Sequence, residues 1–215
     1  MMNNQDIITE YLKNILPDQR DWETELITYA KENRIPIIEP VSMRFITQLI
    51  KLSQPAHILE IGTAIGYSAL SMHHALPKAK ITTLERDDEM ISQAKENFAK
   101  YSINDHLNLI TGDALNTLPE LIAEEKEYDF IFIDAAKGQY KKFFEYAMSL
   151  QVNKGVIVTD NVLFKGYATG KLNNHNRFQK LGKKINEYNI WLMNNEKYDT
   201  SILPIGDGIA LSIKK

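Results

Sequence analysis

The chain has 215 residues, which is enough for one α/β domain with a short accessory segment. Hydrophobic residues make up 44% of it and charged residues 25%, which excludes a disordered or collagen-like protein. The absence of cysteine excludes disulfides, thiolate zinc sites and cysteine nucleophiles, and favours a cytoplasmic location. No apolar run approaches the roughly 20 residues of a membrane span, and the polar N-terminus does not resemble a signal peptide. The net charge of −3 argues against a general nucleic-acid coat protein.

The first 53 residues are expected to form a helical extension. Apolar side chains recur at helical spacing in two stretches, and Pro17 should end the first of them. Pro40 could open a third helix, because proline is tolerated at the first helical position. The apolar positions are Ile7, Ile8, Tyr11, Leu12 and Ile15, then Trp22, Leu26, Tyr29 and Ala30, and finally Phe45, Ile46, Leu49 and Ile50.

Beyond residue 53, short apolar strands alternate with helices. This alternation predicts a parallel sheet covered on both faces, and right-handed crossovers make it a doubly wound, Rossmann-like sheet. The chain has no internal repeat, low-complexity tract or long linker, so residues 1–215 are expected to form a single domain. The predicted strands are 57–61, 80–84, 106–110, 128–133 and 155–159, and the predicted helices are 67–75, 87–100, 115–124 and 140–150.

The C-terminal region departs from this alternation. Two β-prone runs, 200–203 and 208–213, are joined by a short segment that contains proline and two glycines. This arrangement predicts a β-hairpin. We therefore expect an α/β fold with a mostly parallel seven-stranded sheet that ends in an antiparallel hairpin.

The turn after the first predicted strand is the expected ligand site, because open α/β sheets bind ligands at the carboxyl ends of their strands. Gly62 would allow a sharp turn and close approach of a ligand, and Gly66 would let the next helix pack closely. A dinucleotide fingerprint needs G-x-G-x-x-G, but position 64 is Ala64. Glu60 places an acid before the first glycine, which suits a cationic ligand such as S-adenosylmethionine better than a pyrophosphate.

Acidic residues also follow the second and third predicted strands. Glu85 lies about 20 residues past the glycines, where an acid can accept hydrogen bonds from ribose hydroxyls. Asp113 should lie near the adenine edge. Each residue alone could be a helix cap or part of a turn. Their occurrence at successive strand ends predicts a nucleotide-type site.

Oxygen-bearing side chains follow the fourth and fifth predicted strands, which should neighbour the first. Asp134, Asp160 and Asn161 could bind a divalent cation, and hard oxygen ligands of this kind suit Mg²⁺. Asp160 and Asn161 alone could equally be turn residues. Their combination with Asp134 and Lys137 favours a metal site.

The pattern E-x-G-x-x-x-G resembles motif I of class I methyltransferases. With Asp134, Lys137, Asp160 and Asn161, the chain resembles the cation-dependent O-methyltransferases, which include the catechol and caffeoyl-CoA enzymes. The stretches 35–40, 60–68 and 203–208 are most similar to the bacterial branch that methylates 5-hydroxyuridine at the tRNA wobble position, giving 5-methoxyuridine.

This resemblance implies the class I methyltransferase fold, S-adenosylmethionine as cofactor, a homodimer and a set of site residues. A hydroxyl beside a divalent metal loses its proton more readily, and Lys137 would accept that proton before the oxygen takes the methyl group. Asp134, Asp160 and Asn161 would bind the metal. The implied cofactor-binding residues are Val41, Glu60, Gly62, Gly66, Tyr67, Ser68, Glu85, Asp113, Ala114 and Asp134.

The acceptor could be tRNA or a small molecule. The segment from 162 to 186 contains six basic residues and no acid, which suits phosphate contacts but could also be a solvated helix face. We expect Lys165, Arg177, Lys180 and Lys184 to contact the tRNA anticodon region. Ala135 and Ala136 supply no aromatic wall for a flat phenol, and no further C-terminal acid matches the one used by catechol enzymes.

The sequence disfavours two other functional classes. A nicotinamide-dependent oxidoreductase is disfavoured by the missing dinucleotide fingerprint. A binding module without catalytic activity is disfavoured because the candidate base, Lys137, is present together with all three candidate metal ligands.

Overall fold

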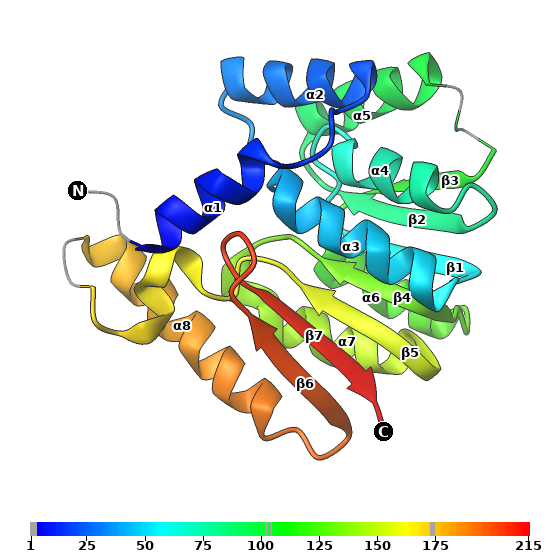
Figure 1. Cartoon of the computed structure of the whole chain (residues 1–215). Helices are drawn as coiled ribbons and strands as arrows, with labels where there is room; N and C mark the ends of the chain where they lie inside the picture. Colours follow the sequence, from blue (N-terminus) through cyan, green and yellow to red (C-terminus); the bar gives the residue numbers. More distant parts are fainter. Residues whose placement is uncertain (1–3, 102, 104, 173–174) are drawn as a thin grey trace.

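The computed structural model describes residues 4–101, 103, 105–172 and 175–215. Its strands are β1 (His57–Ile61), β2 (Lys80–Glu85), β3 (Leu107–Thr111), β4 (Tyr128–Ile133), β5 (Gln151–Thr159), β6 (Tyr198–Leu203) and β7 (Ile209–Lys214). They form one seven-stranded sheet in the order β3-β2-β1-β4-β5-β7-β6 (Figure 1). Neighbours among β1 to β5 pair in parallel, whereas β7 runs antiparallel to both β5 and β6. The predicted fold class and the C-terminal hairpin are therefore confirmed.

Helices cover both faces of this sheet. They are α1 (Asn4–Asn14), α2 (Asp21–Glu32), α3 (Pro40–Ser53), α4 (Tyr67–Ala75), α5 (Asp88–Lys100), α6 (Ala114–Ala123), α7 (Tyr140–Leu150) and α8 (Asn176–Met193), with 3₁₀ turns η1 (Lys137–Gln139) and η2 (Phe164–Thr169). As predicted, α1 to α3 form a helical extension at the N-terminus, and Pro40 lies at the first position of α3. None of the described helices is long and apolar enough to cross a membrane.

Two apolar layers fill the space between the helices and the sheet, because successive strand side chains point to opposite faces. Ile58 and Phe130 belong to the layer shared with α3, α4 and α5. Leu59 and Ile131 belong to the opposite layer, under α6, α7 and α8. All four side chains are fully buried. Burial on both faces explains why β1 and β4 have nearly continuous apolar sequences.

The fifth strand is longer than the sequence pattern predicted. We expected it to begin at Gly155, but β5 begins at Gln151, directly after α7 ends at Leu150. Tyr128 pairs with Gln151, and the register shifts before Phe130. The polar residues of this irregular segment concealed its β-structure, because they lack the apolar pattern of the paired region.

Two glycines at the end of β1 allow the close packing on which the site depends. A Cβ atom at Gly62 would lie 2.0 Å from the backbone oxygen of Asp134, so β1 and β4 meet here without room for a side chain. A Cβ atom at Gly66 would lie 2.4 Å from the ring of Phe98 on α5. Both glycines have positive φ angles, of 101° and 88° respectively, which side chains rarely adopt.

We predict that Gly62→Ala lowers the free energy of unfolding by about 3 kcal/mol or more, because it adds backbone strain to an unavoidable clash. Gly170→Ala is the matched control: Gly170 also has a positive φ, of 72°, but a Cβ atom there would meet nothing within 4 Å. The control should lose only about 1–2 kcal/mol. Urea unfolding of both variants measures the difference, and equal losses would contradict the packing explanation.

Candidate functional site

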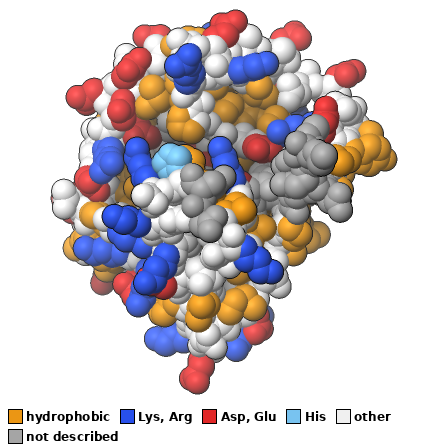
Figure 2. Space-filling view, turned by 90° about the vertical axis from the view of Figure 1, so that its left-hand side faces the viewer, with side chains coloured by type: hydrophobic (Ala, Val, Ile, Leu, Met, Phe, Trp, Pro, Cys, Tyr) orange, Lys and Arg blue, Asp and Glu red, His pale blue; other side chains and the backbone are white. Residues whose placement is uncertain are grey.

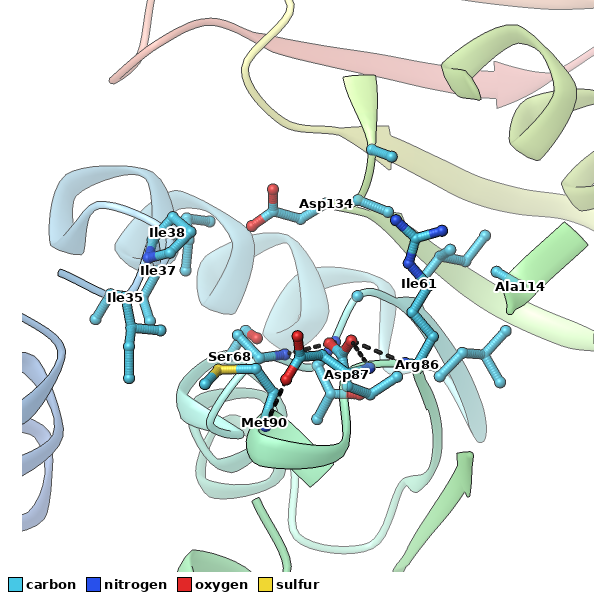
Figure 3. A pocket seen from close by; sticks show the side chains of 18 of the residues that line it. Ile35, Ile37, Ile38, Ile61, Ser68, Arg86, Asp87, Met90, Ala114 and Asp134 are labelled. Atoms are coloured by element: carbon cyan, nitrogen blue, oxygen red, sulfur yellow. Dashed lines mark hydrogen bonds between the residues drawn. The ribbon is translucent and has the colours of Figure 1, made fainter. Parts of the chain in front are cut away.

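A cavity of about 720 Å³ opens at the carboxyl ends of the parallel strands. Its size lies within the usual range for small-molecule sites. In Figure 3, Ile35, Ile37 and Ile38 form one side of the cavity, and Asp134 lies between them and Ala114. The segment after α2 therefore supplies an apolar wall that faces the polar strand ends.

Most of the predicted site residues line this single cavity. The predicted cofactor residues among its lining are Gly62, Tyr67, Ser68, Glu85, Asp113, Ala114 and Asp134, and the predicted base and metal ligands are Lys137, Asp134, Asp160 and Asn161. Val41, Glu60 and Gly66 are not among the lining residues. Gly66 lies against Phe98 of α5, not only beside the helix that follows it, so its close packing involves a different helix from the one that the sequence indicated.

Glu85 is held by backbone groups from two turns. One carboxylate oxygen accepts hydrogen bonds from the amides of Thr63 (3.2 Å) and Ala64 (2.9 Å). The other accepts from the amides of Arg86 (2.8 Å) and Asp87 (3.0 Å). Glu85 thus joins the turn after β1 to the turn after β2 at the cavity wall. Its contact with the ribose hydroxyls stays a prediction.

Asp113 has an additional partner that the sequence did not indicate. Its carboxylate accepts a hydrogen bond from the amide of Leu115 (2.9 Å), which caps α6, and pairs with the Arg86 guanidinium at 3.0 Å. The Leu115 amide and, to a lesser extent, Arg86 lower the pKa of Asp113. Arg86 also lines the cavity, and its position directly after Glu85 is the signal that could have identified it.

Glu60 has a different environment from the one we expected. It is fully buried, and it accepts a hydrogen bond from the Thr83 hydroxyl at 2.5 Å. Burial raises the pKa of Glu60 to about 8, although hydrogen bonds from Ser68 and Thr83 oppose the shift. Glu60 is therefore mainly a neutral acid beneath the cavity wall, and the geometry does not favour a direct charge contact with a cationic ligand.

Four polar side chains meet where β4 and β5 end. The Lys137 ammonium lies 2.5 Å from Asn161 Oδ1, and the Asn161 amide nitrogen lies 3.2 Å from Asp160 Oδ2. Asn161 has a positive φ of 57°, which its short amide side chain tolerates better than most residues. The candidate base thus contacts Asn161, and Asn161 contacts Asp160, while Asp134 lines the same cavity.

Two carboxylates lie close together at this point: Asp160 is buried, and Asp134 is half-buried at the cavity wall. Burial raises the pKa of Asp134, while Lys137 lowers it. Burial and the nearby Asp134 raise the pKa of Asp160 well above its usual value. Asp160 Oδ1 is buried without a hydrogen-bond partner among the described atoms. Unpaired buried carboxylates are costly, so this group fits a divalent cation.

The composition of the proposed metal site is unusual. No group of three His, Cys, Asp or Glu side chains that could hold a metal occurs among the described residues. The proposed set instead combines two carboxylates with the Asn161 amide. Amide and carboxylate oxygens, together with water, are ordinary ligands of Mg²⁺ and Ca²⁺.

Two further residues near this site were not identified from the sequence. Tyr140 is buried, and its hydroxyl donates a hydrogen bond to the backbone oxygen of Asp160 at 2.9 Å. Asp207, between the hairpin glycines, accepts a hydrogen bond from the Lys165 amide. Burial raises the pKa of Asp207, and the nearby charges of Lys137 and Lys165 oppose that shift. The sequence shows that Asp207 lies between two glycines, but it does not show that the hairpin lies close to β5.

The basic segment begins beside the site and continues along α8. Lys165, Arg177, Lys180 and Lys184 are all exposed. A Cβ atom at Gly138, in the turn that follows Lys137, would lie 4.0 Å from the Lys184 ammonium. Figure 2 shows Lys and Arg side chains gathered around the middle of one face of the molecule. The structure thus brings part of the basic segment next to the base.

The parallel sheet with its antiparallel hairpin and its strand-end cavity has the architecture of a class I methyltransferase. A family model for O-methyltransferases matches residues 18–215, so the chain belongs to the O-methyltransferase family. It is 32% identical over the full length of both chains to a catechol O-methyltransferase from Niastella koreensis.

Solved structures agree with this assignment. A proposed caffeoyl-CoA O-methyltransferase from Staphylococcus aureus is 39% identical, with a TM-score of 0.89 over 98% of this chain and 100% of that one. A methyltransferase from Podospora anserina, solved with bound S-adenosylhomocysteine (SAH), is 29% identical, with a TM-score of 0.87 over 100% and 97%. The chain is an S-adenosylmethionine-dependent O-methyltransferase by family.

We predict that Glu60→Gln changes how stability depends on pH. Because the pKa of Glu60 is about 8 in the folded protein and ordinarily 4.5, the folded state keeps a proton between these values that the unfolded chain releases. Stability of the native protein therefore falls as pH rises through this window, and the glutamine variant lacks this contribution.

The stability of Glu60→Gln relative to the native protein should rise by roughly 2–4 kcal/mol between pH 5 and pH 8. Denaturant unfolding at several pH values measures this difference. Other titrating groups are common to both proteins and cancel. A constant difference across the pH range would show that Glu60 is ionised in the folded state.

Proposed function

We propose that this protein transfers the methyl group of S-adenosylmethionine to a hydroxyl that lies beside a second oxygen atom of the acceptor. The observation that carries the proposal is the contact of Lys137 with Asn161 beside the buried Asp160 and the half-buried Asp134, in the same cavity as Glu85 and Asp113. Cofactor and acceptor would therefore meet at the end of β4.

In this proposal, different residues bind the cofactor, bind the metal and accept the proton. Glu85 and Asp113 would hold the ribose and adenine ends of the cofactor. Asp134, Asp160 and Asn161 would hold a divalent cation, which when bound lowers the pKa of an acceptor hydroxyl. Lys137, in its neutral amine form, would take the proton from that hydroxyl as a general base and become an ammonium. Because the oxygen must approach the methyl group in line, positioning contributes much of the rate.

Small molecules are one candidate class of acceptor. The relatives named above are a catechol enzyme and a proposed caffeoyl-CoA enzyme, and a caffeoyl-CoA O-methyltransferase from Populus kitakamiensis is 31% identical over 78% of this chain. These names support a catechol-like or caffeoyl-CoA-like acceptor more directly than any other class. Both carry a pair of neighbouring oxygen atoms.

5-Hydroxyuridine at the wobble position of tRNA is the other candidate, and a specific observation favours it. Its hydroxyl and neighbouring carbonyl form a similar oxygen pair, and a loop base can be turned out into a pocket. The ammonium of Lys184 lies close to the turn that carries Lys137, and Ala135 and Ala136 supply no aromatic wall. We propose tRNA as the acceptor on this ground; the homodimer stays a prediction.

The acceptor is tested by supplying the purified protein with Mg²⁺, labelled S-adenosylmethionine, and either catechol, caffeoyl-CoA or tRNA that contains 5-hydroxyuridine. Our proposal predicts methylation of the tRNA at least 100-fold more efficiently, by kcat/KM, than of either phenol. The reverse preference would establish the small-molecule activity.

The metal is tested by chelation. Excess EDTA should abolish turnover with any acceptor but leave cofactor binding intact, and full activity in EDTA would exclude the metal mechanism.

A triple variant tests the basic face. Arg177→Ala/Lys180→Ala/Lys184→Ala should lower tRNA affinity about 10-fold or more at low salt and reduce the salt dependence, because three phosphate contacts are lost. S-adenosylmethionine affinity should not change. Filter binding across a range of salt concentrations measures both effects on RNA.

The matched control removes the same charge elsewhere. Lys51, Lys78 and Lys95 are exposed, on α3, before β2 and on α5 respectively. Lys51→Ala/Lys78→Ala/Lys95→Ala should retain most of the tRNA affinity. If both triple variants lost affinity equally, net charge rather than the α8 face would account for RNA binding.

A further inference from the structure

Tyr140 lies at the first position of α7, immediately behind the proposed metal site. Its side chain is only 1% exposed, and its ring packs near Tyr188 of α8, with ring centroids 5.6 Å apart. Its hydroxyl donates to the backbone oxygen of Asp160 at 2.9 Å. A buried hydroxyl with a defined partner holds that partner in place, because breaking the bond would leave polar atoms without water.

The peptide that Tyr140 contacts joins Asp160 to Asn161, two of the proposed metal ligands. Asn161 has a left-handed backbone conformation. This conformation lets the Asn161 side chain contact both Asp160 and Lys137. A small rotation of the peptide would separate the Asn161 amide oxygen from Lys137 and the Asn161 amide nitrogen from Asp160.

Backbone contacts fix the same segment on either side. The Asp160 amide donates to the backbone oxygen of Ile133 at 3.0 Å, and the Val162 amide donates to that of Gly208 at 3.0 Å. The oxygen of the Asp160–Asn161 peptide is directed away from the cavity, toward α7. The hydroxyl of Tyr140 is its partner, so the sheet alone does not determine its orientation.

We propose that Tyr140 is a positioning residue that orients Asp160 and Asn161 toward Asp134 and Lys137. This inference rests on the proposed function, because it assigns a structural cause to the arrangement of the metal ligands and the base. The interaction acts through the peptide, and Tyr140 does not itself need to contact the acceptor or the metal.

The chain provides a matched control. Tyr188 is also buried, packs in the same aromatic group, and forms a hydrogen bond with the Thr159 side chain at 2.8 Å. Thr159 lies one residue before Asp160, but the contact involves its hydroxyl and not the Asp160–Asn161 peptide. Tyr188→Phe therefore removes an equivalent buried hydroxyl without freeing that peptide.

The test compares Tyr140→Phe and Tyr188→Phe in the full-length protein. Mn²⁺ affinity is measured by electron paramagnetic resonance, and kcat is measured at saturating cofactor with whichever acceptor the native protein methylates best. Tyr140→Phe should weaken Mn²⁺ binding about 10- to 100-fold, the usual effect of removing groups that orient metal ligands. Its kcat should fall similarly, and S-adenosylmethionine affinity should not change. Tyr188→Phe should change both values less than 3-fold.

Equal Mn²⁺ affinities and equal kcat values in the two variants would overturn the positioning function of Tyr140. If the native protein itself binds no Mn²⁺, the metal assignment fails. In that case the kcat comparison still decides the inference, because Lys137 and Asn161 would need the same orientation. A larger kcat loss in Tyr140→Phe than in Tyr188→Phe supports it, and equal losses refute it.

Discussion

The close approach of β1 and β4 at their carboxyl ends is the constraint on which the site depends. At Gly62 the two strands come so near that the Asp134 backbone oxygen occupies the place where a Cβ atom would lie. The Asp134 amide also donates to the backbone oxygen of Ile61 at 3.0 Å. This contact places the start of the loop that carries Asp134 directly beside the turn after β1.

Two chemically different regions therefore share one cavity. On the β1–β2–β3 side, Glu85 and Asp113 are satisfied by backbone amides and Arg86, which suits the recognition of neutral hydroxyl and amino groups. On the β4–β5 side, Asp160 is buried with one carboxylate oxygen unpaired and lies close to the half-buried Asp134, which suits a cation. Methyl transfer requires an electrophile and an activated oxygen to meet, and the end of β4 is where these two regions join.

Much of this arrangement was predictable from the sequence, because the periodic apolar pattern determines a parallel sheet and ligands bind at its carboxyl edge. Residues at the carboxyl end of a strand or directly after it, such as Glu85, Asp134 and Asp160, could be placed for that reason. The environment of Glu60 could not be predicted. Thr83 lies opposite Glu60 because of the register in which β1 pairs with β2, which the pattern of a single strand does not reveal.

Contacts between segments that lie far apart in the sequence could not be predicted either. Tyr140 and Asp207 approach the end of β5 only because α7 and the C-terminal hairpin pack around it, and neither lies in a strand-end motif. The basic residues of α8 were expected to share one helical face, but the position of Lys184 beside Gly138 depends on how that helix packs. Local spacing identified the groups, and tertiary packing determined which of them meet.

The proposed site places a divalent cation among Asp134, Asp160 and Asn161, next to the cofactor. The most direct test is a crystal structure with SAH and Mn²⁺, with anomalous diffraction measured near the manganese absorption edge. We expect one strong anomalous peak among the three side chains, about 2.0–2.4 Å from their oxygen atoms. A fully occupied cofactor site with no peak there, or with manganese bound elsewhere, would contradict the proposed site.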